Sequence, residues 1–115
     1  MKKERNIKVY LDDILESIGK IEKYTEEVSE EEFYKNDQLQ DSILRRLEVI
    51  GEAVNNIPKE FRDKYSKIPW RKISGIRNVL IHEYFGVNMK RVWKVIVEDI
   101  SKLKEDIIKI KKEID

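Results

Sequence analysis

The chain has 115 residues and a net charge of +1; 41% of its residues are charged, 40% are hydrophobic, and it contains four glycines, two prolines and no cysteine. This length and composition favour a single all-α domain spanning residues 1–115, and the lack of cysteine excludes disulfides, thiolate zinc sites and cysteine nucleophiles. Because no stretch approaches the roughly 18 to 20 apolar residues of a membrane span, we expect a cytoplasmic protein without membrane contact.

The first half of the chain predicts an αα-hairpin. Apolar residues recur at spacings of three and four over about residues 5–28, which predicts a long amphipathic helix. Ser29 and Glu32 then match a capping box for a short helical turn. Asn36 or Asp37 can cap a second long amphipathic helix, which stops at Pro58.

The second half predicts two short helices and one long helix. Pro58 suits the first position of a short helix, and Pro69 opens a central helix in which Trp70 is a core anchor whose indole N–H needs a partner. Residues 85–87 form a break, after which Asn88 can cap a last helix that runs to Ile114.

Three long amphipathic helices and shorter ones can bury their apolar stripes together as an antiparallel bundle. The stripes are wide for so small a core, which favours a homodimer. A two-fold axis would also bring the same polar residues of two chains together.

The central segment, residues 70–84, reads WRKISGIRNVLIHEY. Arg77, Asn78, His82 and Tyr84 interrupt its apolar helical pattern. At 100° per residue Asn78 and His82 share a face, whereas Arg77 lies about 140° around the helix from His82. Either the helix is distorted after Leu80, or the long Arg77 side chain bends back, or two copies of the segment meet at a symmetric interface.

Positive charge is concentrated around this segment. Residues 58–94 contain ten basic and three acidic residues, giving +7, whereas the remainder has 14 basic and 20 acidic residues, giving −6. This asymmetry suits an anionic partner such as nucleic acid, although a charged run can also be an ordinary solvated face.

The segment has the side chains for acid–base chemistry at a phosphate. His82 is the only histidine and is suited to proton transfer near neutral pH. The guanidinium of Arg77 can stabilise a phosphate in its transition state, and Asn78 can orient the imidazole or contact the phosphate. These groups fit metal-free RNA cleavage, in which the ribose 2′-hydroxyl attacks the adjacent phosphorus.

Other chemistries fit less well, and a structural role stays open. A metal site would need more ligands than Glu83 beside His82, and no phosphate-binding glycine loop is present. Ser74 shares a face with Asn78, but no nucleophile elbow surrounds it. An arginine and a histidine on one helix can also be ordinary surface or interface residues.

The run RNVLIHEY matches the R-x-x-x-x-H-x-Y signature of the HEPN superfamily, and the longer stretch PWRKISGIRNVLIHEYFGV resembles the HepT-like toxins of HEPN/MNT toxin–antitoxin pairs. The resemblance extends over nearly the whole chain. It also includes IGEAVNNIP at residues 50–58 and VWKVIVEDI after the central segment.

This resemblance implies the toxin of a type VII-like pair: an all-helical homodimer that acts as a metal-independent endoribonuclease without cofactors. Arg77 and His82 would be the catalytic pair, supported by Asn78. Tyr84 would be the tyrosine to which a partner minimal nucleotidyltransferase, the antitoxin, transfers AMP. The toxin could also form a larger hetero-oligomer with that partner.

Two other functions fit the same residues. One is a non-catalytic helical module that binds nucleotide or a partner protein and is associated with a nucleotidyltransferase, with Arg77 as a phosphate anchor. The other is a helical dimer in which the polar motif only specifies the interface.

Overall fold

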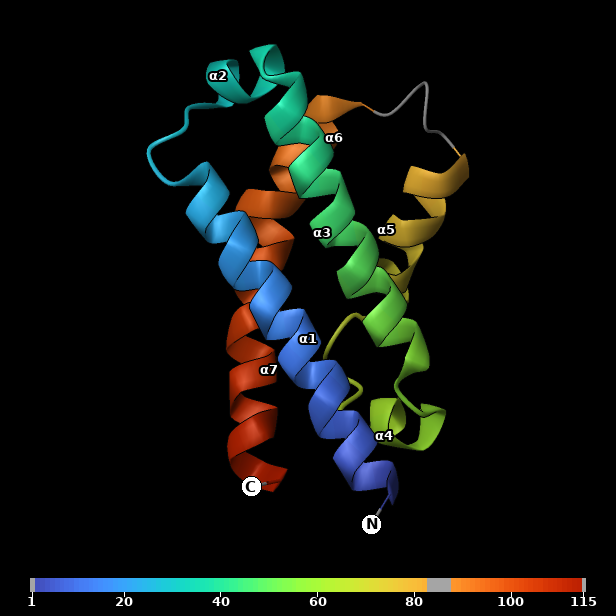
Figure 1. The fold of residues 1–115 in the computed structure, drawn as a ribbon. Coiled ribbons are helices and arrows are strands. Elements are labelled where there is room, and N and C mark those ends of the chain that lie inside the picture. The colour runs from blue at the N-terminus through green and yellow to red at the C-terminus, as the bar shows by residue number, and fades with distance from the viewer. Residues whose placement is uncertain (1, 83–87, 115) are drawn as a thin grey trace.

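The computed structural model describes residues 2–82 and 88–114, with side chains described for residues 6–76 and 88–114. Within these ranges all regular structure is helical, which confirms the predicted all-α fold. Figure 1 shows a bundle in which α1 (Lys2–Thr25) packs against α3 (Asp37–Asn56) on one side and α7 (Ser101–Ile114) on the other. None of the described helices is long and apolar enough to cross a membrane.

Helix α1 ends three residues earlier than the apolar pattern predicts. Glu27 has a φ of 61°, a left-handed conformation that a helix cannot continue through. The N–H of Val28 then donates to the carbonyl of Thr25 at 3.0 Å, which closes the last turn. Val28 nevertheless packs against the core, so its place in the apolar stripe is confirmed, whereas the prediction that it is helical is wrong.

The predicted caps of the next two helices are confirmed. Ahead of α2 (Glu30–Lys35), the N–H of Glu32 donates to Ser29 Oγ at 3.1 Å and the N–H of Ser29 donates to Glu32 Oε1 at 3.2 Å. The side chain of Asn36 accepts from the N–H of Leu39 at 3.0 Å and so caps α3. These bonds satisfy backbone donors that a helix start leaves unpaired.

Helix α4 (Lys59–Lys64) and the segment after it lead into α5 (Trp70–His82) and contact its first residue. Pro58 is the cap residue before α4 and not its first residue, which corrects the predicted boundary by one position. The Trp70 indole Nε1 donates to the carbonyl oxygen of Tyr65 at 3.0 Å, so the buried indole has the partner it needs. Burial and a hydrogen bond with Glu113 raise the pKa of Tyr65.

The last helix is continuous but not regular. It consists of α6 (Met89–Lys94), a π-helical turn (Val95–Ile100) and α7, and Asn88 caps its start as predicted. In α geometry, each four-residue step from Val92 to Ile96 to Ile100 would rotate the apolar stripe by about 40°. A π turn holds more residues and reduces that drift. All three side chains are buried.

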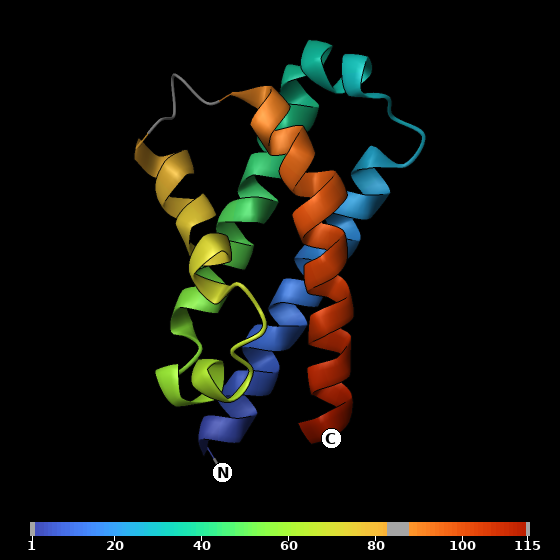
Figure 2. The same cartoon turned by 180° about the vertical axis from the view of Figure 1, so that it is seen from behind.

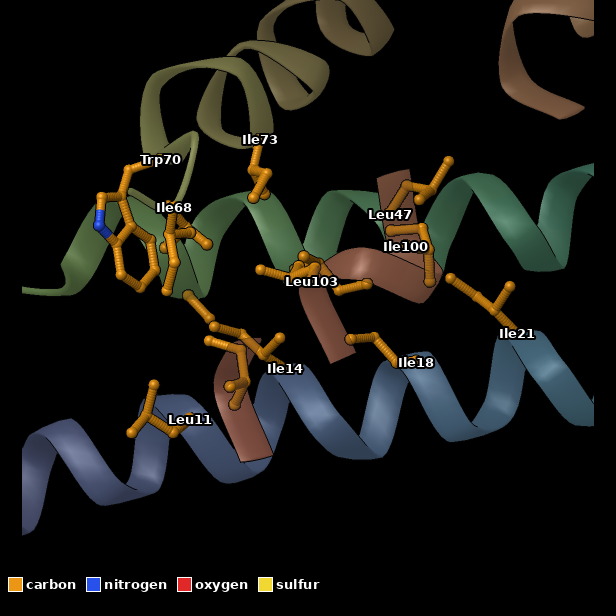
Figure 3. Close-up of a cluster of buried hydrophobic side chains, with 14 of the residues drawn as sticks. Leu11, Ile14, Ile18, Ile21, Leu47, Ile68, Trp70, Ile73, Ile100 and Leu103 are labelled. Carbon is orange, nitrogen blue, oxygen red and sulfur yellow. The ribbon is translucent and has the colours of Figure 1, made fainter. Parts of the chain in front are cut away.

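One hydrophobic core joins these helices (Figure 3). It is built from isoleucine and leucine side chains at helical spacing, with Phe33 and Trp70 as its large aromatic members. The fully buried positions of α1 are Leu11, Ile14, Ile18 and Ile21. This core is the feature that the periodicity of the sequence predicts best.

We expect Glu27→Gly to stabilise the protein, because glycine adopts a positive φ without the penalty that a side chain incurs. The free energy of unfolding in urea should rise by up to about 1 kcal/mol. Glu26→Gly removes the same charge one residue earlier, at a position without a positive φ, and should give no gain. An equal gain for both variants would mean that charge, and not backbone conformation, limits this helix end.

Candidate active site on helix α5

Three of the four predicted site residues lie on the last two turns of α5: Arg77, Asn78 and His82. Their backbone is α-helical, and their side chains lie outside the described part of the chain. Tyr84 and the predicted break at residues 85–87 also lie outside the described residues. The structure therefore describes the helix that carries the motif, and the roles of these side chains remain predictions.

The backbone of α5 bears on the geometry of the motif. The helix continues as an α-helix through His82, which argues against the first of the three alternatives, a distortion after Leu80, up to that residue. On a regular helix, Arg77 and His82 are separated by about 7.5 Å along the axis and about 140° around it. The two remaining ways to bring both groups to one atom are a bent-back arginine and a second copy of the chain.

The first half of α5 is fixed to the rest of the bundle. Trp70 and Ile73 are buried, with 5% and 3% of their surfaces exposed, and Figure 3 shows them beside α3 among the core residues. One turn after Trp70, Ser74 Oγ donates to Asn55 Oδ1 of α3 at 3.2 Å. This bond gives Ser74 a structural partner on α3, and it directs the hydroxyl toward that helix.

An ion pair joins α5 to the last helix. Lys72 Nζ lies 3.1 Å from Asp99 Oδ1, and the Asp99 side chain is only 23% exposed. A small pocket opens beside this pair between the two helices, and its lining comprises Pro69, Lys72, Ile73, Ile76, Asp99, Lys102 and Leu103. The pair shows that Lys72 and Asp99 lie at the same level of the two antiparallel helices.

The basic segment predicted from the sequence is largely solvent-facing where its side chains are described. Its exposed cations are Lys59, Lys64, Lys67, Arg71, Lys72, Lys90, Arg91 and Lys94. Within residues 6–76 and 88–114, no group of three histidine or acidic side chains is arranged to hold a metal ion.

Sequence reasoning missed both the π turn and the Lys72–Asp99 pair. The two residues of the pair are 27 positions apart, so no local spacing connects them. The only signal was an acidic residue next to the apolar stripe of the last helix. The π turn had no marker, because its four-residue apolar spacing is also compatible with an α-helix.

Comparison with known proteins points to one family of ribonucleases. A family model described as ribonuclease HepT-like matches residues 14–110. A Methanocaldococcus jannaschii protein named "Gamma-glutamylcyclotransferase and putative RNase" is 49% identical over 111 residues, 96% of this chain, which spans only half of that relative's length. A Thermococcus cleftensis protein named "Probable ribonuclease HepT" is 43% identical over 109 residues, covering 95% of this chain and 99% of the relative. No solved structure matches the chain.

Because Trp70 anchors α5 in the core, alanine substitutions at Trp70 and at the adjacent Arg71 should change the free energy of unfolding by different amounts. Trp70→Ala should lower the free energy of unfolding by about 3 to 5 kcal/mol, because it removes a buried aromatic side chain and the indole hydrogen bond to the Tyr65 carbonyl, which keeps only the N–H of Ile68 as a donor. Arg71→Ala, at an exposed position, should change it by no more than about 0.5 kcal/mol. Urea unfolding measures both, and similar values for the two would show that Trp70 does not anchor the helix.

Proposed function

Because the chain belongs to the HepT-like ribonuclease family, we propose that it is a metal-independent endoribonuclease with Arg77 and His82 as its catalytic pair. The observation that carries this proposal is the family match over residues 14–110, which includes all of α5. The sequence supports it further, since the only histidine and a neighbouring arginine lie together in the most basic part of the chain.

The proposed reaction is an internal transfer of the phosphodiester. The ribose 2′-oxygen loses its proton and attacks the adjacent phosphorus, while the bond to the 5′-oxygen breaks and that oxygen gains a proton. The products are a 2′,3′-cyclic phosphate and a 5′-hydroxyl. His82 transfers the proton at one of these two oxygens, and Arg77 stabilises the charge that builds on the non-bridging oxygens. Asn78 holds the imidazole or the phosphate.

We further propose that the active unit is a homodimer in which the α5 helices of two copies face a common cleft. A regular helix separates Arg77 from His82 by about 140°, so one α5 presents them to different sides. A two-fold axis places the arginine of one copy near the histidine of the other. Such an arrangement forms two equivalent sites per dimer.

The proposed regulation acts on Tyr84. A partner minimal nucleotidyltransferase would transfer AMP from ATP to the phenolic oxygen, forming a phosphodiester and releasing pyrophosphate. The added group places bulk and negative charge two residues from His82, which excludes an anionic substrate by occlusion and repulsion. The chain would then be the toxin and its partner the antitoxin, and the two could assemble into a larger hetero-oligomer.

The purified protein should cleave RNA in EDTA and leave 2′,3′-cyclic phosphate ends. His82→Ala and Arg77→Ala should each lower the cleavage rate by about 100-fold or more, because each removes a group needed in the transition state. Arg45→Ala removes an exposed arginine from α3 and serves as the control. A folded wild-type protein that cleaves no RNA but binds it would favour the non-catalytic binding module.

The regulatory part has a separate test. Incubation with ATP and a cognate minimal nucleotidyltransferase should add the mass of AMP to wild-type protein and not to Tyr84→Phe. The modified protein should lose RNA cleavage, whereas Tyr84→Phe treated in the same way should retain it. Mass spectrometry that locates AMP on one of the other tyrosines would contradict the assignment.

A further inference from the structure

The first turns of the last helix carry exposed cations that the stability of the fold does not explain. Lys90 and Arg91 lie in the first turn of α6, and Lys94 follows in the next turn. Positive charge is unfavourable at the N-terminal end of a helix, and this turn contains no acidic residue to offset it. Arg91 and Lys94 form no ion pair with any residue of the described ranges.

Arg91 lies on the side of the last helix that faces α5. Arg91, Val95 and Asp99 follow one another at four-residue steps, so they lie along one side of the helix. Asp99 contacts Lys72 of α5, and Val95 is partly buried against the core. The same side, two turns before Asp99, therefore presents a guanidinium toward the region of α5.

The Lys72–Asp99 ion pair also allows the positions of Arg91 and Lys94 along the bundle axis to be compared with those of Arg77 and His82. Figure 2 shows α5 rising to the end of the molecule where α6 begins, while the last helix descends toward the C-terminus. Lys94 and Arg91 precede Asp99 by five and eight residues, or no more than about 7.5 and 12 Å. Arg77 and His82 follow Lys72 by five and ten residues, or about 7.5 and 15 Å. The cations of α6 thus stand level with the last two turns of α5.

We propose that Arg91 and Lys94 bind backbone phosphates that flank the scissile phosphodiester, so that single-stranded RNA lies between the end of α5 and α6. This inference rests on the proposed ribonuclease function and names residues that position its substrate. Contacts to phosphates carry no base identity, and therefore these residues set affinity and register without selecting a sequence. A substrate too short to reach α6 gains nothing from them.

The binding test uses a short single-stranded RNA with 2′-O-methyl sugars, which cannot be cleaved by attack of the 2′-oxygen. For Arg91→Gln/Lys94→Gln, Kd should rise, and the slope of log Kd against log salt should fall by about 1.4, since each lost phosphate contact contributes about 0.7. The matched control is Lys109→Gln/Lys112→Gln, which removes two exposed charges from the opposite end of the same helix. It should leave the slope unchanged.

The kinetic test separates positioning from chemistry. On a long RNA, Arg91→Gln/Lys94→Gln should raise KM and leave kcat close to wild type, and on a dinucleotide the two proteins should be equal. An unchanged salt slope with the binding probe overturns the inference, whether or not the wild type cleaves RNA. Failure of the wild type to cleave any RNA overturns the proposed function instead, and the two failures are distinguishable. Circular dichroism verifies the fold of each variant.

Discussion

The position of the candidate site depends on the packing of the first half of α5. Trp70 and Ile73 enter the core beside α3, and Ser74 bonds to Asn55 at the same level. Because a helix is stiff, fixing its first two turns also fixes the direction in which the next two turns continue. Those turns carry Arg77, Asn78 and His82. A core contact thus determines where the proposed chemistry takes place.

The last helix lies beside α5 and carries the other charged residues near the candidate site. Its π turn coincides with the segment from which Asp99 reaches Lys72 on α5. An ion pair with one exposed partner contributes little to stability, so it does not hold the two helices in place. It shows which levels of the two antiparallel helices are adjacent, and from this the cations of α6 are level with the motif. The basic segment of the sequence is therefore distributed over α4, the connection after it, α5 and α6, and it is not a single charged helix face.

Most of the fold follows from periodicity and capping. The buried stripe of α1, the capping box at Ser29 and the cap at Asn36 are all visible as local patterns, because each depends on residues within one or two turns. The end of α1 at Thr25, before the left-handed Glu27, could not be predicted, since a left-handed glutamate has no marker in composition or spacing. The same holds for a contact such as Lys72 to Asp99, which only the tertiary packing creates.

For the candidate site, too, one part could be predicted from the sequence and another could not. That Arg77 and His82 occupy one helix was predictable from the apolar pattern around them, and the helix through His82 confirms it. Whether an assembly brings the two groups to one site was not predictable, because a regular helix separates them. The resemblance to HepT-like proteins gave the chemistry, which helical spacing alone left open between catalysis and a structural role.

The most direct test is to mix Arg77→Ala with His82→Ala after subunit exchange. If each site combines the arginine of one copy with the histidine of the other, half of the exchanged dimers contain one intact site, and about one quarter of wild-type RNA cleavage should return. A mixture that stays as inactive as its parents, while native mass spectrometry detects the mixed dimers, would contradict a site shared between two copies.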